Sequence, residues 1–236
     1  CTALALDPVE KKPLQRFYPG KKVLSVGSFG CNMSCPFCQN FEISMAGEQE
    51  LESVPFSPKE LAKQAEALRT RGNIGIAFTY NEPLVGYEYV RDTAREVRKR
   101  GMKNILVTNG AFTEETEDAV LSYIDAMNID LKGFTESYYK KLGGDLETVK
   151  AFIEKAVKVC HVELTTLVVP GENDSVSEMQ NLAKWTASLS CEIPLHVTRF
   201  FPRWKMQDRE AADVRKVYRL AEEAGKYLKY VYTGNC

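Results

Sequence analysis

The stretch KKVLSVGSFGCNMSCPFCQN, residues 21–40, joins an apolar run typical of a buried strand to a loop that carries three cysteines. Cys31, Cys35 and Cys38 follow the spacing C-x-x-x-C-x-x-C, so three thiols lie within eight positions. Thiolates gathered in this way are ligands for zinc or for an iron–sulfur cluster. The stretch therefore predicts a fold in which a strand delivers a metal-binding loop at its carboxyl end.

The composition of the 236-residue chain is that of an ordinary globular protein, with 44% hydrophobic and 27% charged residues. The 31 basic residues nearly balance the 32 acidic ones, so no overall field favours nucleic acid or an anionic membrane. No apolar run approaches the roughly 20 residues that span a bilayer. The start of the chain shows no signal-peptide pattern.

The cysteine count argues against a secreted disulfide framework, because the number is odd, seven, and three of the cysteines are crowded together. We therefore expect a cytoplasmic protein. Both ends look cut, since the chain begins with Cys1 rather than Met and stops at Cys236 in YTGNC. Cys236 either opens a second metal-binding knuckle whose remainder is missing or marks the end of a segment with no such role.

Short apolar runs alternate with amphipathic stretches along the chain. The expected strands span residues 21–28, 73–80, 103–110, 126–133, 161–169, 192–200 and 228–231. The expected helices lie at 57–72, 84–101 and about 114–124, then up to about 159, near 175–189 and near 208–225. This alternation predicts right-handed βαβ units and a parallel sheet. Six or seven units fit either a doubly wound open sheet or a full or partial barrel, and in both the ligand lies at the carboxyl ends of the strands.

The number of cysteines in the loop narrows the choice of metal. Structural zinc prefers a closed set of four ligands. The chain has no second C-x-x-C, and neither His161 nor His196 is near the loop in sequence. Three thiolates therefore predict an open coordination site, either on zinc with water or on a four-iron cluster in which one iron lacks a cysteine.

The motif C-x-x-x-C-x-aromatic-C after the first of these strands resembles that of the radical S-adenosylmethionine superfamily. The segments CNMSCPFCQN, FTYNEP, LVTNG, NIDLKG and LVVPGENDS are similar to those of the branch that contains pyruvate formate-lyase activating enzyme. The closest resemblance is to the radical S-adenosylmethionine proteins of the AmmeMemoRadiSam system. The resemblance implies one domain over residues 1–236, a partial (βα)6 TIM-like barrel of parallel strands, truncated at both ends. It also implies a 4Fe–4S cluster on the three cysteines, with S-adenosylmethionine chelating the fourth iron.

The resemblance gives Glu82 in FTYNEP a role in binding the methionyl ammonium of S-adenosylmethionine, and a carboxylate suits a cation. Asn81 would add a neutral hydrogen bond. Tyr80 and Asn81 stand where the family often has two glycines, so the approach of the backbone to the cofactor would differ. The alternative is that Glu82 is an exposed charge at a helix N-terminus.

In AMNIDLKG, Asn128, Asp130 and Lys132 alternate and so share one face of the strand. Parallel strands are normally buried on both faces, so a charged face needs a cavity or a ligand. The resemblance implies that Asp130 and Lys132 contact the ribose and the carboxylate of the cofactor. The alternative is an ion pair at a solvated strand end.

Four further residues complete the implied cofactor site. Thr108 and Asn109 end the third strand, although Thr-Asn-Gly is also plain turn chemistry. Val107 stands where activating enzymes usually carry an Asp that helps to bind a monovalent cation, which puts that cation in doubt. His196 would reach the adenine or ribose, or else be a core residue. Phe37 would lie against the adenine, or else pack the loop on the barrel.

The activity implied by the resemblance is reductive cleavage of S-adenosylmethionine to a 5′-deoxyadenosyl radical that takes hydrogen from a substrate. It requires a one-electron donor such as flavodoxin or ferredoxin. The substrate would be a glycyl residue of a partner protein, while a small molecule or another protein modification stays open because fold does not determine substrate. The alternative from a different functional class is a non-catalytic iron–sulfur or zinc protein that transfers electrons or acts as a scaffold. It would not need Glu82, Asp130 and Lys132.

Overall fold

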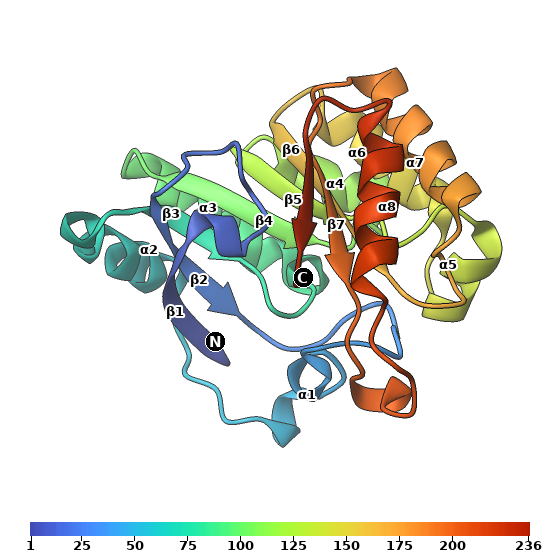
Figure 1. The fold of residues 1–236 in the computed structure, drawn as a ribbon. Helices are drawn as coiled ribbons and strands as arrows, with labels where there is room; N and C mark the ends of the chain where they lie inside the picture. The colour runs from blue at the N-terminus through green and yellow to red at the C-terminus, as the bar shows by residue number, and fades with distance from the viewer.

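The computed structural model describes residues 1–236, except for the side chain of Glu48. The described backbone forms one eight-stranded sheet, in which the spatial order of the strands is their order in the chain (Figure 1). The strands are β1 (Ala3–Pro8), β2 (Lys22–Gly27), β3 (Asn73–Phe78), β4 (Lys103–Thr108), β5 (Ala126–Asp130), β6 (His161–Val168), β7 (Leu195–Arg199) and β8 (Val231–Gly234).

Helices follow most of the parallel strands. The α-helices are α1 (Phe41–Ser44), α2 (Pro58–Ala67), α3 (Tyr87–Lys99), α4 (Glu114–Leu121), α5 (Glu136–Leu142), α6 (Leu146–Ala156), α7 (Val176–Leu189) and α8 (Val214–Gly225). Short 3-10 helices are η1 (Val9–Lys11), η2 (Glu48–Glu50), η3 (Arg69–Arg71), η4 (Pro83–Gly86) and η5 (Trp204–Met206). The caps follow local sequence: Ser57 accepts a hydrogen bond from the Glu60 N–H at the start of α2.

The topology decides between the two predicted architectures. Strands β2 to β8 are all parallel, and each pairs with the next strand in the chain. Successive helices also pack on one another in chain order, α2 on α3, α3 on α4 and α7 on α8 (Figure 1). A doubly wound sheet reverses its strand order, so this order corresponds to a partial barrel, as predicted. Strands β1 and β8 form its two edges.

Two details differ from the prediction. Strand β1 was not expected; it pairs antiparallel with β2, from Ala3 opposite Gly27 to Pro8 opposite Lys22. Strand β8 begins at Val231, where the predicted strand 228–231 ends. Residues 228 and 229 instead continue the turn after α8, because the Leu228 N–H donates to the carbonyl of Ala224.

The two faces of the sheet are filled differently. The outer face packs against the helices as one apolar core. On the inner face, side chains of β2 to β5 meet the segment that follows β1, forming a second cluster of Val9, Leu14, Phe17, Val23, Ala77, Ile105 and Ala126. Residues 9–17 therefore plug the interior of the barrel. No helix of the described residues is long and apolar enough to cross a membrane.

Candidate functional site

The cysteine loop, residues 28–40, leaves the carboxyl end of β2 and crosses the open end of the barrel to α5 and η5. The Ser34 N–H donates to the carbonyl of Leu142 at the end of α5 (2.9 Å), and the Lys205 N–H in η5 donates to the carbonyl of Pro36 (3.0 Å). Phe37 is buried in the apolar core, as the packing reading of this residue predicted. The loop is thus anchored at both sides of the barrel mouth.

The three cysteines of the loop differ in exposure. Cys35 is buried, whereas Cys31 and Cys38 are partly exposed. Burial raises the pKa of the Cys31 thiol to about 11, and it also raises the pKa of Cys35. The Met33 N–H points at the Cys31 sulfur from 3.4 Å. Without a bound cation, therefore, the thiols of Cys31 and Cys35 stay protonated at neutral pH.

Glu82 is a buried carboxylate at the carboxyl end of β3, not an exposed helix charge. One carboxylate oxygen accepts hydrogen bonds from the Leu84 N–H (3.0 Å) and the Thr108 hydroxyl (2.8 Å). The other accepts from the Asn109 N–H (2.7 Å). Burial raises the pKa of Glu82 to about 7, although these hydrogen bonds act in the opposite direction. A buried carboxyl group poised near neutrality is a strong candidate for binding a cation.

Asn109 connects this carboxylate to the cysteine loop. Its side-chain nitrogen lies 3.7 Å from the Cys31 sulfur and 2.8 Å from Oδ1 of Asn32. Its side-chain oxygen accepts from the Ala111 N–H (2.8 Å), which fixes the orientation of the amide. The structure therefore brings Cys31, Glu82, Thr108 and Asn109 together at the carboxyl ends of β2, β3 and β4.

Asn81 holds the entry of the cysteine loop. Its side-chain oxygen accepts from the Ser28 N–H (2.9 Å), and its nitrogen donates to the carbonyls of Phe29 (3.0 Å) and Gly30 (3.1 Å). The amide is therefore occupied by loop backbone. A hydrogen bond from Asn81 to a cofactor stays a prediction, and the role that the contacts support is loop placement.

Asp130 and Lys132 form an ion pair at the end of β5, with Lys132 Nζ 2.8 Å from Asp130 Oδ2. The backbone N–H of Lys132 donates a hydrogen bond to the Tyr139 hydroxyl at 3.0 Å. Burial opposes the charge on Lys132, but the Asp130 carboxylate outweighs burial and raises the pKa of the amine. The pair therefore lies at the carboxyl end of β5, the end of the barrel from which the cysteine loop also leaves β2.

His196 is buried on the inner face of β7, where Nε2 lies 2.6 Å from Glu163 Oε2. The other Glu163 oxygen lies 2.9 Å from Nε2 of His161, and the N–H groups of Gln15 and Arg16 donate to the same carboxylate at 3.0 and 2.8 Å. Burial opposes ionisation, but these four contacts lower the pKa of Glu163 to about 2. The direct contacts of His196 are structural, and its contact with a cofactor stays a prediction.

Glu163 is the carboxylate at the centre of these contacts and is not among the site residues predicted from the sequence. It occupies an inward position between Val162 and Leu164 in the buried strand β6. A charged residue at such a position requires buried partners. That rule was the available signal, but it could not identify Gln15 and Arg16 as partners, because they lie about 150 positions earlier in the chain.

The three thiols of the loop are the ligand set of a four-iron cluster in which one iron lacks a cysteine. No group of three or more His, Cys, Asp or Glu side chains in the described part of the chain is arranged to hold a metal ion. A four-iron cluster binds each thiolate through a different iron, so its ligands need not converge on one point. The N–H donors of Met33 and Asn109 that face Cys31 match the hydrogen bonds that tune cluster sulfur.

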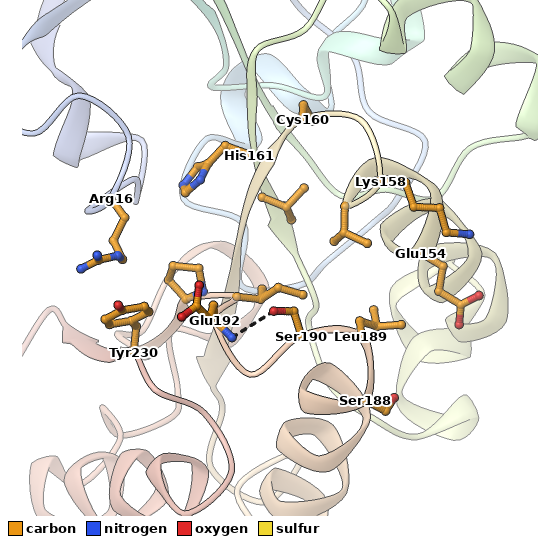
Figure 2. A pocket seen from close by; sticks show the side chains of 14 residues that line it. Arg16, Glu154, Lys158, Cys160, His161, Ser188, Leu189, Ser190, Glu192 and Tyr230 are labelled. Carbon is orange, nitrogen blue, oxygen red and sulfur yellow. Dashed lines mark hydrogen bonds between the residues drawn. The ribbon is translucent and has the colours of Figure 1, made fainter.

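Two cavities differ in their relation to this site. A cavity of about 240 Å³ adjoins the cysteine loop and is lined by residues that include Pro36, Phe37, Tyr138, Leu142 and Met206. A larger cavity, about 690 Å³, lies at the amino ends of β6 and β7 (Figure 2). There the guanidinium carbon of Arg16 lies 3.7 Å from the ring centroid of Tyr230. The amino ends of parallel strands face away from the ligand edge, so we place the functional site at the cysteine loop despite the smaller cavity.

The sequence-ordered sheet and the three-cysteine loop define an α/β protein of the partial-barrel class, with its site at the carboxyl ends of the strands. Residues 25–185 match the model of the Radical SAM superfamily, and the chain belongs to that superfamily.

Similar proteins span several activities within that family. Protein MJ0808 of Methanocaldococcus jannaschii, which has no assigned activity, is 39% identical over 99% of this chain and 69% of its own length. The 7-carboxy-7-deazaguanine synthase of the same organism is 23% identical over 90% of this chain and 88% of its length. Pyruvate formate-lyase 1-activating enzyme of Escherichia coli is 28% identical over 68% of this chain and 66% of its length.

Solved structures support the fold. Streptococcus suis SuiB bound to S-adenosylmethionine aligns with 91% of this chain and 52% of its own, with a TM-score of 0.70 and 14% identity. At this identity the likeness concerns architecture alone. It confirms the partial barrel that the resemblance implied, which is one of the architectures that the strand–helix alternation left open.

Proposed function

We propose that this protein is an enzyme that cleaves S-adenosylmethionine reductively and abstracts hydrogen from a substrate. The observation that supports the proposal is the contact of Asn109 with both Cys31 and the buried Glu82 carboxylate, with the Asp130–Lys132 pair at the carboxyl end of a strand of the same sheet. An electron-transfer or scaffold protein would need the thiols but not a buried carboxylate of raised pKa beside them.

The chain's residues have distinct roles in this proposal. The cluster and S-adenosylmethionine supply the radical chemistry, and the protein positions them and excludes water. Cys31, Cys35 and Cys38 hold the cluster. Glu82 receives the ammonium group of S-adenosylmethionine, and Lys132 its carboxylate.

The remaining predicted residues line the outer parts of the cofactor site. Asp130 accepts hydrogen bonds from the ribose hydroxyls, Phe37 packs near the adenine, and His196 faces the adenine or ribose from β7. Thr108 and Asn109 act through Glu82, because both already donate hydrogen bonds to its carboxylate.

The proposed substrate is a glycyl residue of a partner protein, and the proposed electron source is flavodoxin or ferredoxin. The support is the similarity to pyruvate formate-lyase activating enzyme over 68% of this chain. The barrel is also bounded by two edge strands, β1 and β8, so its wall is not continuous. A protein loop could enter at that position.

A small-molecule substrate is the second candidate. It is favoured by the relative that acts as a 7-carboxy-7-deazaguanine synthase, which matches 90% of this chain, more than the activating enzyme does. Substrate-free cleavage of S-adenosylmethionine cannot separate the two. Transfer of deuterium from a labelled candidate substrate into 5′-deoxyadenosine would distinguish the protein substrate from the small molecule.

The test of the activity is release of 5′-deoxyadenosine by the anaerobically reconstituted protein, given S-adenosylmethionine and dithionite. We expect release from the wild type and none from Cys35→Ala. Cys160→Ala is the matched control, since this thiol lies just before β6, at the amino ends of the parallel strands. A wild-type protein that carries four irons yet releases nothing would contradict the proposal and favour an electron-transfer or scaffold role.

A further inference from the structure

Tyr80 adopts a backbone conformation that bulky residues rarely occupy. Its φ is +77°, in the left-handed region. The residue lies two positions after the end of β3 and directly before Asn81 and Glu82. For an aromatic residue this conformation is strained, and it persists only where the surroundings enforce it. The neighbours of Tyr80 therefore have to supply that enforcement.

The side chain of Tyr80 is anchored by the segment that begins the chain. Its hydroxyl donates to Asp7 Oδ2 at 2.9 Å, and Lys12 Nζ lies 4.7 Å from the ring centroid. The ring also packs on Gly27, where a Cβ would come within 3.0 Å of Tyr80 Cδ2. Asp7 on β1, Lys12 after it and Gly27 on β2 thus enclose the phenol from three sides.

Asp7 is itself fixed rather than mobile. Its carboxylate also accepts hydrogen bonds from Ser25 (2.8 Å), Lys12 (3.0 Å) and Lys11 (3.2 Å). Burial opposes its ionisation, but the hydrogen bonds from Lys12, Ser25 and Tyr80 keep the pKa of Asp7 well below its usual value. Tyr80 is therefore bonded to a charged group that cannot turn away.

The backbone turn at Tyr80 places both ends of the cysteine loop. The Tyr80 carbonyl accepts from the Asn40 side chain at 2.7 Å, just after the third cysteine. On the other side, the Asn81 amide holds residues 28–30, and the Glu82 N–H donates to the Gly30 carbonyl at 3.3 Å. A change in the backbone at residue 80 would therefore move the loop and the Glu82 carboxylate relative to each other.

We infer that Tyr80 is a positioning residue for S-adenosylmethionine binding, which acts by holding the cysteine loop and Glu82 in register through its anchor on Asp7. The inference rests on the proposed function, since it concerns the same site. Tyr80 itself is not a catalytic residue. A glycine would adopt this φ without strain but would leave the turn free to relax, whereas the anchored phenol fixes it.

The experiment compares Tyr80→Phe, which keeps the ring and loses the Asp7 hydrogen bond, with Tyr80→Gly, which keeps the permitted φ and loses the anchor. Tyr218→Phe, an exposed tyrosine on α8, is the control. For each cluster-loaded protein, iron content, thermal unfolding and the dissociation constant of S-adenosylmethionine are measured. We expect full iron content and a dissociation constant raised about tenfold in both Tyr80 variants, as loss of a hydrogen bond to a charged group would give.

A double-mutant cycle with Asp7→Asn adds the specific readout. If the anchor acts through Asp7, Tyr80→Phe should weaken binding by a smaller factor in the Asp7→Asn background than in the wild type. A lower unfolding temperature with an unchanged dissociation constant would assign Tyr80 a role in folding only, and would overturn the inference.

Hydrogen exchange in the cofactor-free protein separates this inference from the proposed function. Tyr80→Gly and Tyr80→Phe should speed exchange of the Ser28, Glu82 and Asn109 amides, which are bonded within this network. This result is expected whether or not the protein binds S-adenosylmethionine. Unchanged exchange at these amides would refute the positioning role, while a wild type that fails to bind the cofactor would refute the proposed function instead.

Discussion

The side-chain nitrogen of Asn109 lies 3.7 Å from the sulfur of Cys31, so an amide dipole points at the first of the three loop cysteines. A hydrogen bond to sulfur stabilises the more negative, reduced state of an iron–sulfur cluster. Asn109→Ala removes this donor but keeps the backbone N–H that binds Glu82.

We expect Asn109→Ala to lower the reduction potential by on the order of 40 mV, which corresponds to about 1 kcal/mol for one electron. The measurement is an anaerobic redox titration followed by electron paramagnetic resonance. Asn181→Ala, an exposed amide on α7, is the control. A potential equal to that of the wild type would mean that the contact does not persist in the loaded protein.

Binding of S-adenosylmethionine should depend on the ionisation of Glu82. Its pKa of about 7 is raised by burial, so the carboxylate is lost as the pH falls through neutrality. We expect the affinity to fall about fivefold between pH 7 and pH 6, below the titration of the ligand's own amino group. Equilibrium dialysis over this range checks the prediction. Glu82→Gln should bind weakly and independently of pH, and a wild type without pH dependence would speak against the pairing.

Lys132 should contribute to cofactor affinity through its charge. The side chain is only 14% exposed and its amine is held by Asp130 at 2.8 Å, so its direction is fixed before a ligand arrives. We expect Lys132→Met to raise the dissociation constant of S-adenosylmethionine at least about tenfold, as loss of a charge-assisted contact would. Lys155→Met, which removes a surface ion pair, should leave it unchanged. Equal effects of the two variants would contradict the assignment.

Glu163 should matter for stability rather than for cofactor binding. Removing a buried carboxylate that bonds two histidines and two backbone N–H groups costs about 3–5 kcal/mol of unfolding free energy. We expect Glu163→Ala to show this loss in urea denaturation at pH 7, and Glu154→Ala, an exposed carboxylate on α6, to show almost none.

The pH dependence of this loss has a defined sign. The folded pKa of Glu163, about 2, lies below the ordinary value of 4.5, so its stabilisation is complete above pH 4.5 and disappears as the pH falls toward 2. The difference in unfolding free energy between wild type and Glu163→Ala should therefore shrink over this interval. A difference that stays constant down to pH 2.5 would show that packing, not charge, accounts for the loss.

The parallel strands were predictable because each apolar run is followed by an amphipathic helix, and chain order then fixes neighbour order. Strand β1 escaped prediction because six residues followed only by a three-residue 3-10 helix, and not by an amphipathic α-helix, carry no such signal. Its antiparallel pairing depends on the turn after Pro8.

The site was predictable to the extent that motif positions fall at strand ends. Cys31, Glu82 and Asn109 do meet at one edge of the sheet. The bond between Asp7 and Tyr80 could not be foreseen, since 73 positions separate the residues and only the assembled barrel brings them together. Periodicity reports which face a side chain occupies but not which distant group it meets there.

The agreement between spatial order and chain order of the strands has a consequence for how the protein folds. Each parallel pairing joins two neighbouring segments, so the sheet can grow one strand at a time as the chain leaves the ribosome. The contacts of Glu163 with Gln15 and Arg16 close a separation of 148 and 147 positions and cannot form until β6 is in place. The plug of the barrel is therefore synthesised before the seven parallel strands, yet its contacts with β6 are among the last to form.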